Sequence, residues 1–355
     1  MTASSSFLTR LGIRHPIIQA PMAGTSTPQL AAAVSNAGGL GSLGIGANST
    51  DHARQAIQET RRLTDRPFNV NVFCHEPAPY DAAHNIEWIR YLDPLFLEVG
   101  AAVPTQLEEI YQSFLHSEDT FDMLLQERPA VVSFHFGIPS ATCVNELRQA
   151  GIKTMATATN QHEATLIEQC GIEAIVAQGI EAGGHRGMFD PFADDEALST
   201  SVLVRLLSQR TRLPIIAAGG IMDGKGVKAA LDLGAVAAQL GTAFILCPES
   251  AASASYRKNL KSKRAHSTML TSVISGRPAR GMVNRLIQYG EAALAPAPAA
   301  YPYAYDAAKQ LNTAAAQQNN HEFAAQWAGQ GAPLARELSA TELMATLIHE
   351  LEATL

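Results

Sequence analysis

A single histidine stands in a glycine-rich segment near the middle of the chain. The segment reads AIVAQGIEAGGHRGMFD from Ala174 to Asp190, and its histidine is His185. An imidazole titrates near neutral pH, so it can accept or donate a proton in a reaction. Glycines clustered in this way mark a backbone with positive φ or one that closely approaches another group. We therefore predict that His185 is a catalytic residue beside a bound molecule.

Three other polar side chains fall near the ends of apolar segments. Asn71 lies in FNVNVF, His135 in VVSFHFG and Gln178 in AIVAQG. Since alternate residues of a strand share a face, the three side chains can all point into a closed barrel at its mouth. Buried amides and imidazoles are costly unless they have hydrogen-bond partners, which a bound ligand would supply. The alternative is that each is a core polar group satisfied by its neighbours.

Two glycine-rich segments further along the chain predict a phosphate site. PIIAAGG at 214–220 ends in Gly219 and Gly220, and AVAAQLGTAF at 235–244 contains Gly241 and Thr242. Exposed backbone N–H groups at the ends of the last two barrel strands often bind phosphate. The chain has no GxGxxG fingerprint and no Walker sequence, so a nucleotide-binding site of those types is not predicted.

The elements that would position these residues alternate between strands and helices. Short apolar segments occur at 16–22, 38–44, 67–73, 130–137, 153–159, 174–179, 214–220 and 235–244. Helix-like stretches separate many of them, and several of these stretches end on glycine. Eight such strands predict an α/β fold of the (β/α)8 TIM-barrel type, with a smaller, mostly helical second domain. An open doubly wound sheet is the alternative, but it would gather its glycines at one switch point.

The pattern also predicts a domain boundary. Residues 1–250 form the barrel, with a helical insertion at about 74–129 that covers one end of it. Residues 251–355 form a mostly helical region, whose last helix begins with a capping box at Ser339 and Glu342. The segment LAPAPAAYPYAY at 294–305 is rich in Pro and Ala and is not expected to form a regular helix.

Composition excludes several classes of protein. Hydrophobic residues make up 46% and charged residues 17% of the 355 residues, which is typical of a globular chain. The net charge of −7 gives no general attraction to nucleic acid or to anionic membranes. The four cysteines are scattered without metal-ligand spacing, so we predict no metal site and reduced thiols. No secretory signal or membrane span is evident, which predicts a cytoplasmic protein.

Taken in order, the segments PIIQAPMAG, GGLGSLG, NVNVF, SFHFG, QGIEAGGHRG, PIIAAGGI and QLGTAF resemble the nitronate monooxygenases, over nearly the entire chain. The resemblance implies one non-covalent FMN and a catalytic histidine at His185. The family's flavin site falls on Ala20, Pro21, Met22, Ala23, Gly24, Asn71, Gln178, Gly183, Gly184, Gly219, Gly220, Gln239, Gly241 and Thr242.

The class I branch of the family also has side chains around the substrate. They match His135, Tyr301, Tyr305 and Lys309, together with Asn71, although Tyr303 leaves the register of the tyrosines ambiguous by two residues. The resemblance thus implies that the loop at 294–310 returns to the active site. The implied reaction is oxidation of propionate 3-nitronate and alkyl nitronates by O2 through a flavin semiquinone, giving a carbonyl compound and nitrite. His185 acts either as a neutral base or as a cation that pairs with the nitro group. The resemblance leaves a monomer or a homodimer open.

Another class of FMN barrel shares these strand ends. An NAD(P)H-dependent reductase of the quinone or enoyl type is therefore the alternative function, although no distinct nicotinamide-binding pattern is evident. A barrel that binds phosphate without a flavin, such as an aldolase, is a further alternative. An enzyme like IMP dehydrogenase would need a nucleophilic cysteine after strand six, where this chain has His185.

Overall fold

Eight parallel strands form a nearly closed barrel in the computed structural model, which describes residues 3–354. The strands are β1 (Ile17–Gln19), β2 (Gly41–Gly44), β3 (Phe68–Phe73), β4 (Val131–His135), β5 (Lys153–Ala158), β6 (Ala174–Gln178), β8 (Ile215–Ala218) and β9 (Ala237–Leu240). Their order is β1-β9-β8-β6-β5-β4-β3-β2, and a bridge between Ile18 and Leu40 brings β1 beside the chain entering β2. The predicted TIM barrel is confirmed.

Helices surround this barrel. They are α1 (Ala3–Leu11), α2 (Pro28–Asn36), α3 (Thr50–Leu63), α5 (Glu118–Glu127), α6 (Ala141–Gln149), α7 (Gln161–Gln169), α8 (Thr200–Ser208), α9 (Gly224–Asp232) and α13 (Ala340–Glu352). Side chains such as Ser140, Asn160 and Asp223 cap the first turns by accepting a backbone N–H. Such caps satisfy donors that have no partner inside the helix, which fixes where each helix begins.

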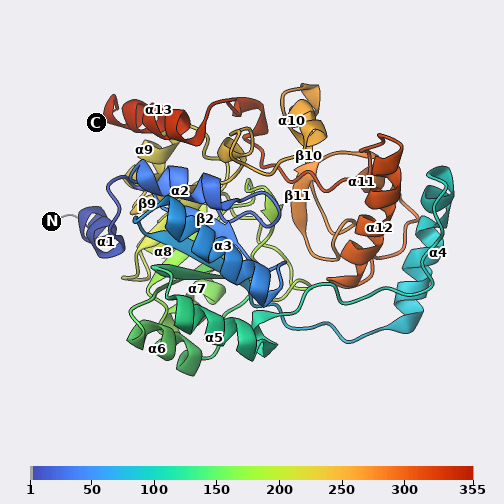
Figure 1. Ribbon diagram of the computed structural model, residues 1–355, viewed down its shortest axis with the longest axis horizontal. Coiled ribbons are helices and arrows are strands. Elements are labelled where there is room, and N and C mark those ends of the chain that lie inside the picture. Colours follow the sequence, from blue (N-terminus) through green and yellow to red (C-terminus); the bar gives the residue numbers. More distant parts are fainter. Residues whose placement is uncertain (1–2, 355) are drawn as a thin grey trace.

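The ring of helices is completed by the far end of the chain. Helix α13 packs against α9 and α2, and its Leu343, Met344 and Leu347 belong to the barrel's hydrophobic core (Figure 1). It begins with the predicted capping box, in which Ser339 and Glu342 each bond the other's backbone N–H. The hydrophobic cores therefore do not divide at residue 250, where the sequence predicted the boundary.

A second, smaller lobe lies beside the barrel. It contains α4 (Ala82–Glu98), α11 (Arg285–Gly290) and α12 (Tyr303–Gln317), which share a separate hydrophobic core (Figure 1). Trp88, Leu92 and Phe96 recur every four residues on α4 and are buried in this core. The insertion predicted at 74–129 is thus divided, because α4 packs on α12 whereas α5 packs on α3 of the barrel.

A small antiparallel sheet joins the two parts of the molecule, and the sequence did not predict it. Its strands are β10 (Thr268–Thr271), β11 (Ala279–Met282) and β7 (Gly184–His185), in the order β10-β11-β7. The remaining elements are α10 (Ala254–Leu260) and the 3-10 helices η1 (Phe114–His116), η2 (Thr242–Phe244), η3 (Lys263–His266) and η4 (Ala332–Leu334). The region after residue 250 is therefore helical with one hairpin.

Residues 294–310, which contain Tyr301, Tyr303 and Tyr305, are not a loop throughout, although the sequence predicted one. Only the first part of this segment is irregular, since α12 begins at Tyr303, directly after Pro302. Proline has no N–H to lose, so it is tolerated where a helix starts. Tyr305 and Lys309 consequently lie one turn apart on a helix.

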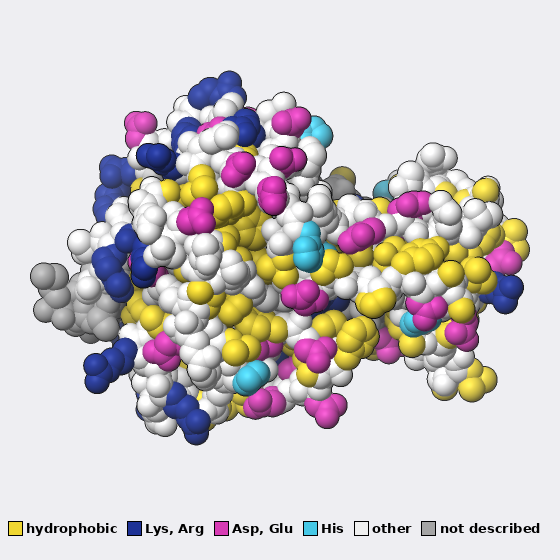
Figure 2. Space-filling view, turned by 90° about the horizontal axis from the view of Figure 1, so that it is seen from below, with side chains coloured by type: hydrophobic (Ala, Val, Ile, Leu, Met, Phe, Trp, Pro, Cys, Tyr) yellow, Lys and Arg dark blue, Asp and Glu magenta, His cyan; other side chains and the backbone are white. Residues whose placement is uncertain are grey.

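Charged side chains are unevenly distributed over the face of the molecule that Figure 2 shows. On the face shown in Figure 2, Lys and Arg side chains lie mostly over the barrel, whereas Asp and Glu are distributed over both parts. All four cysteines are free thiols. Within residues 3–354, every helix is too short or too polar to cross a lipid bilayer.

Candidate active site

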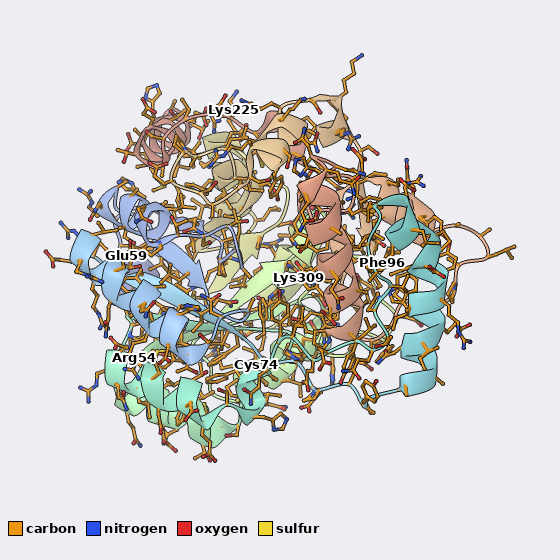
Figure 3. The ribbon with its side chains drawn as sticks, turned by 45° about the vertical axis from the view of Figure 1, so that its right-hand side comes forward. Arg54, Glu59, Cys74, Phe96, Lys225 and Lys309 are labelled. Atoms are coloured by element: carbon orange, nitrogen blue, oxygen red, sulfur yellow. The ribbon has the colours of Figure 1, made fainter. Side chains whose placement is uncertain are left out.

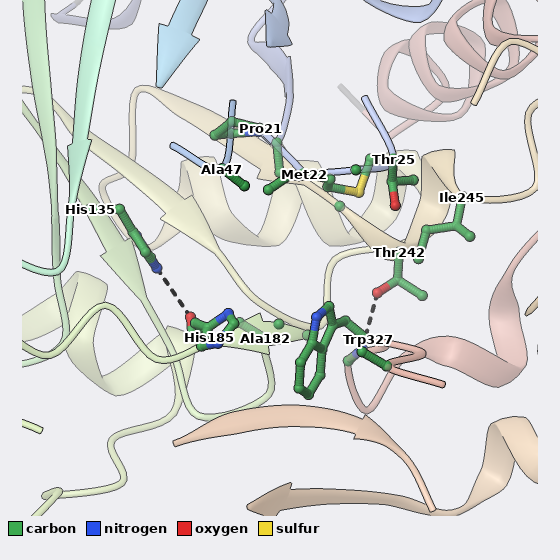
Figure 4. Close-up of a pocket in the computed structure, with 18 of the residues that line it drawn as sticks. Pro21, Met22, Thr25, Ala47, His135, Ala182, His185, Thr242, Ile245 and Trp327 are labelled. Atoms are coloured by element: carbon green, nitrogen blue, oxygen red, sulfur yellow. Dashed lines mark hydrogen bonds between the residues drawn. The ribbon is translucent and has the colours of Figure 1, made fainter. Parts of the chain in front are cut away.

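A cavity of about 580 Å³ opens at the carboxyl ends of the barrel strands. This volume lies within the range of roughly 300–1,000 Å³ that is typical of ligand sites. Every residue that the sequence proposed for the site lines it: Ala20, Pro21, Met22, Ala23, Gly24, Asn71, His135, Gln178, Gly183, Gly184, His185, Gly219, Gly220, Gln239, Gly241, Thr242, Tyr301, Tyr305 and Lys309. Figure 4 shows Pro21 and Met22 on one side of the cavity, with His185 and Trp327 across from them.

Backbone amides without acceptors gather beyond β8 and β9. The N–H groups of Gly219, Gly220 and Gly241 donate no hydrogen bond within residues 3–354. Gly219 has φ +123° and Gly220 has φ +71°, which other residues rarely adopt, and these angles turn the chain at the cavity wall. Thr242 follows at the start of η2, where its hydroxyl accepts the N–H of Gly329 at 3.0 Å (Figure 4). Unpaired amides beside glycines form the kind of concavity that binds an anion.

Gln178 and Asn71 are held by hydrogen bonds within the protein. The Gln178 side chain donates to the carbonyl of His185 at 3.0 Å and accepts the N–H of Gly187 at 2.8 Å. Asn71 donates to the Ser133 hydroxyl at 2.9 Å and to the Ser133 carbonyl at 3.1 Å. Gln178 therefore fixes the path of the glycine-rich segment around His185, while Asn71 is tied to the neighbouring strand.

His185 lies on β7 and is enclosed by aromatic rings. Its ring centroid lies 5.2 Å from that of Trp327, 5.4 Å from Phe136 and 5.9 Å from Tyr301. Its Nε2 lies 2.9 Å from the Ser275 hydroxyl, and its Nδ1 has no hydrogen-bond partner in the described part of the chain. Burial, and to a smaller extent His135 and Arg277, lower the pKa of His185 to about 3. An imidazole with such a lowered pKa is uncharged at neutral pH, so that one of its ring nitrogens can accept a hydrogen bond.

His135 differs from His185 because both of its ring nitrogens have partners. Nε2 lies 3.2 Å from the His185 carbonyl (Figure 4), to which it must donate. Nδ1 accepts from Thr157 Oγ1 at 3.0 Å. Burial lowers the pKa of His135 to about 4. The sequence proposed His135 as a substrate-binding residue, but these contacts leave neither ring nitrogen free for a ligand. Its ring contributes surface to the cavity and supports the His185 segment.

The tyrosine and lysine side chains approach from the second lobe. Tyr301 and Tyr305 line the cavity, whereas Tyr303 packs on Tyr80 in the lobe's own core, so the geometry separates the three tyrosines. The Lys309 ammonium lies 4.7 Å from the ring centroid of Tyr111 and 5.5 Å from that of Tyr305, without an ion pair among the described residues. Figure 3 shows Lys309 on the side of α12 that faces the barrel. An unpaired cation at this wall suits an anionic ligand.

Several residues around the site were missed by the sequence reasoning. Tyr111 and Trp327 line the cavity, and Ser275 contacts His185. Phe136 has φ +72°, a strained value for an aromatic residue, and its ring contacts both His185, at 5.4 Å between centroids, and the Arg277 guanidinium, at 4.4 Å from the ring centroid. Apart from their residue types, nothing in the local sequence distinguishes these positions, because tertiary packing alone brings them to the cavity.

His75 provides a test of stability against pH. It is fully buried against Tyr301, neither of its ring nitrogens makes a hydrogen bond of normal geometry within residues 3–354, and burial lowers its pKa to about 4. Between pH 6.5 and 4 the unfolded chain binds a proton that the folded protein does not bind. The free energy of unfolding should therefore fall by about 1 kcal/mol for each pH unit from this group alone as the pH is lowered. Above pH 6.5 the histidine is neutral in both the folded and the unfolded state, and this loss of stability is absent.

We expect His75→Phe to remove this contribution. Urea unfolding between pH 4.5 and 7.5 should give a pH slope shallower than that of the wild type by about one proton. His52→Asn, at an exposed histidine of α3, is the control and should keep the wild-type slope. Equal slopes in wild type and His75→Phe would show that His75 is protonated in the folded state.

The fold and the cavity define a TIM-barrel enzyme whose site lies at the carboxyl ends of its strands. The sequence model of the nitronate monooxygenase family matches residues 5–350. A nitronate monooxygenase from Pseudomonas aeruginosa is 56% identical over 97% of this chain and 98% of its own length. One from Paraburkholderia phytofirmans is 55% identical over 100% of this chain and 97% of its own. The chain therefore belongs to the nitronate monooxygenase family, whose members are flavin-dependent oxidoreductases.

Solved structures agree with this assignment. A nitroalkane oxidase from Streptomyces ansochromogenes superposes with a TM-score of 0.89 and 37% identity, covering 99% of this chain and 98% of that one. FabK from Thermotoga maritima superposes with a TM-score of 0.74 and 29% identity, covering 98% and 96%. The prediction of an enzyme of this family is confirmed.

Proposed function

We propose that this protein oxidises nitronates with O2 in an FMN-dependent reaction that yields a carbonyl compound and nitrite. Propionate 3-nitronate and alkyl nitronates are the proposed substrates. The observation that carries the proposal is the placement of His185 at a cavity that also contains the amide cradle and Lys309; among the described residues His185 Nδ1 has no hydrogen-bond partner and Lys309 has no ion pair. Relatives named nitronate monooxygenase and a neighbour named nitroalkane oxidase support it.

The lining residues fit FMN. The unpaired N–H groups of Gly219, Gly220 and Gly241 would hold its phosphate, and the remaining cavity between the Ala20–Gly24 turn and His185 would take its ring. When bound, the flavin supplies an electron acceptor next to the substrate carbon. The protein supplies the orientation of the substrate and the charges around it.

Side chains from both the barrel and the second lobe would act on the substrate. Neutral His185 would take the α-proton of a nitroalkane at Nδ1, which converts it to the nitronate. Lys309 would attract the anionic substrate, and its cation would pair with a carboxylate such as that of propionate 3-nitronate. The aromatic rings of Trp327, Phe136 and Tyr301 pack around the imidazole and would limit the access of water to it once the cavity is filled.

The experiment that tests the function combines cofactor identification with turnover. The purified protein should show a flavin spectrum, and the cofactor released by denaturation should have the mass of FMN. Oxygen uptake should begin on addition of propionate 3-nitronate, with nitrite formed. A colourless protein, or a flavoprotein that consumes no oxygen with any nitronate, would refute the proposal.

The amide cradle can be tested separately with Gly219→Ala. A Cβ at this φ of +123° would be strained, and it would lie 2.7 Å from Thr200 Oγ1. We expect FMN binding to weaken about ten- to hundredfold, since such strain costs about 1–3 kcal/mol. The control is Gly171→Ala, with φ +82° and no atom within 4 Å of the added carbon, which should bind FMN normally. Fluorescence titration of the apoprotein measures both.

The reductase alternative needs its own experiment, because the chain also superposes on FabK. Anaerobic mixing with NADH or NADPH distinguishes the two functions. Rapid bleaching of the flavin favours the reductase, whereas slow or absent bleaching together with nitronate oxidation favours the proposed reaction. We also propose that the enzyme is cytoplasmic, acts as a monomer or homodimer, and has only its nitronate and O2 as partners.

A further inference from the structure

The side chain of His185 is positioned by a hairpin from the second half of the chain. Strand β11 pairs with β7, so that Ala279 lies opposite His185, and the Arg186 N–H donates to the Pro278 carbonyl at 2.8 Å. Ser275 lies in the turn between β10 and β11 and is fully buried. One hairpin therefore holds both the backbone of His185 and one nitrogen of its ring.

The turn that carries Ser275 is itself fixed. Gly276 has φ +86°, and a Cβ there would meet the Ala299 carbonyl at 2.5 Å and the Tyr301 nitrogen at 2.4 Å. The turn thus packs directly on the backbone that leads to Tyr301. A serine hydroxyl in such a setting has its position determined before any ligand binds.

The hydrogen bonds of the Ser275 hydroxyl indicate whether Ser275 or His185 is the donor in the contact between them. The Ser275 hydroxyl lies 3.0 Å from the Arg277 carbonyl, and no other donor reaches that carbonyl within residues 3–354. The Arg277 N–H donates to the same hydroxyl oxygen at 3.3 Å. Since a carbonyl can only accept, the single hydroxyl hydrogen satisfies it, and the oxygen accepts from His185 Nε2 at 2.9 Å. The opposite arrangement would leave a buried carbonyl unpaired.

We propose that Ser275 is a positioning residue that fixes His185 in the tautomer with hydrogen on Nε2, so that the lone pair of Nδ1 is free to accept the substrate's α-proton. This inference rests on the proposed function only in its last step. The hydroxyl does for a neutral imidazole what an acidic partner does in other enzymes that use a histidine base: it selects which nitrogen is basic. The other nitrogen keeps its hydrogen throughout.

The tautomer can be observed without turnover. Histidine labelled with ¹⁵N in the holoenzyme should give, for His185, a protonated pyrrole-type Nε2 and an unprotonated pyridine-type Nδ1, assigned by their loss in His185→Asn. Ser275→Ala should shift these signals towards the average of two exchanging tautomers. A wild-type spectrum with hydrogen on Nδ1 overturns the inference, whatever the substrate proves to be.

Kinetics then test the consequence. Ser275→Ala should lower kcat for a neutral nitroalkane about ten- to hundredfold, because proton abstraction depends on the correct tautomer. Oxidation of the preformed nitronate needs no proton abstraction and should change less than threefold. Ser35→Ala is the matched control: Ser35 is also buried, donates to a carbonyl (Pro67, 2.9 Å) and accepts an N–H (Gly41, 3.0 Å), but it lies away from the cavity.

The outcomes separate the two claims. Equal losses with nitroalkane and nitronate in Ser275→Ala, or no loss with either, overturn the positioning role. A wild type that oxidises neither compound refutes the proposed function, and the ¹⁵N spectrum still decides the tautomer. A single Nε2–H tautomer in wild type, lost in Ser275→Ala but kept in Ser35→Ala, supports the inference.

Discussion

Replacing His185 with asparagine is expected to lower kcat/KM for a neutral nitroalkane by about 10²–10⁴-fold, the usual contribution of a general base. Asparagine is polar and of similar size, but its side chain cannot accept a proton at neutral pH. The flavin contacts proposed for this chain come from backbone amides elsewhere in the cavity, so the variant should still purify with its cofactor.

Steady-state oxygen uptake and the flavin absorbance of the same preparation measure both properties. His52→Asn, at an exposed position on α3, serves as the control and should retain wild-type values. Full nitroalkane turnover in His185→Asn would refute the catalytic assignment. Loss of flavin together with turnover would instead give His185 a role in holding the cofactor.

Removing the carboxylate of Asp195 is expected to give the largest loss of stability. Arg186, next to His185, is 1% exposed and forms two hydrogen bonds of 2.8 Å to Asp195, while a third links it to the Gln178 carbonyl. Asp195→Ala would leave a buried guanidinium without its counter-charge. Breaking a buried ion pair in this way costs about 3–5 kcal/mol, and the partial exposure of Asp195 places this pair at the lower end.

Urea unfolding at neutral pH measures this effect. The matched control is Glu337→Ala, which breaks the exposed pair with Lys261 and should cost less than about 1 kcal/mol. Because Arg186 ties the glycine-rich segment to the end of β6, Asp195→Ala should also lower turnover by loosening the position of His185. Similar losses of stability in the two variants would show that the Arg186 pair is not stabilising.

The barrel and its strand-borne site residues were predictable from the sequence for a physical reason. A strand has a period of two residues, so placing Asn71, His135 and Gln178 at strand ends also fixed the direction of their side chains. The glycines after β8 and β9 were predictable because only glycine readily takes such backbone angles. The roles could not be predicted in the same way: the two bonds that occupy His135 come from a neighbouring strand and a distant carbonyl.

Long-range packing accounts for what the sequence did not reveal. An amphipathic helix shows that one face is buried, but not what covers it, so the partners of α4 and α13 could not be read from their patterns. Ser275 lies 90 residues from His185, and only the pairing of β11 with β7 brings them together. A hairpin of two four-residue strands gives too weak a pattern to predict that contact.

The position of α13 has a consequence for how the protein is made. This helix fills the ring between α2 and α9, yet its residues are translated a hundred residues after β9. Chains generally begin to fold from their N-terminal parts while synthesis continues. Until α13 leaves the ribosome, the apolar flanks of α2 and α9 stay uncovered on the nascent chain, and that interval is when a chaperone would be needed.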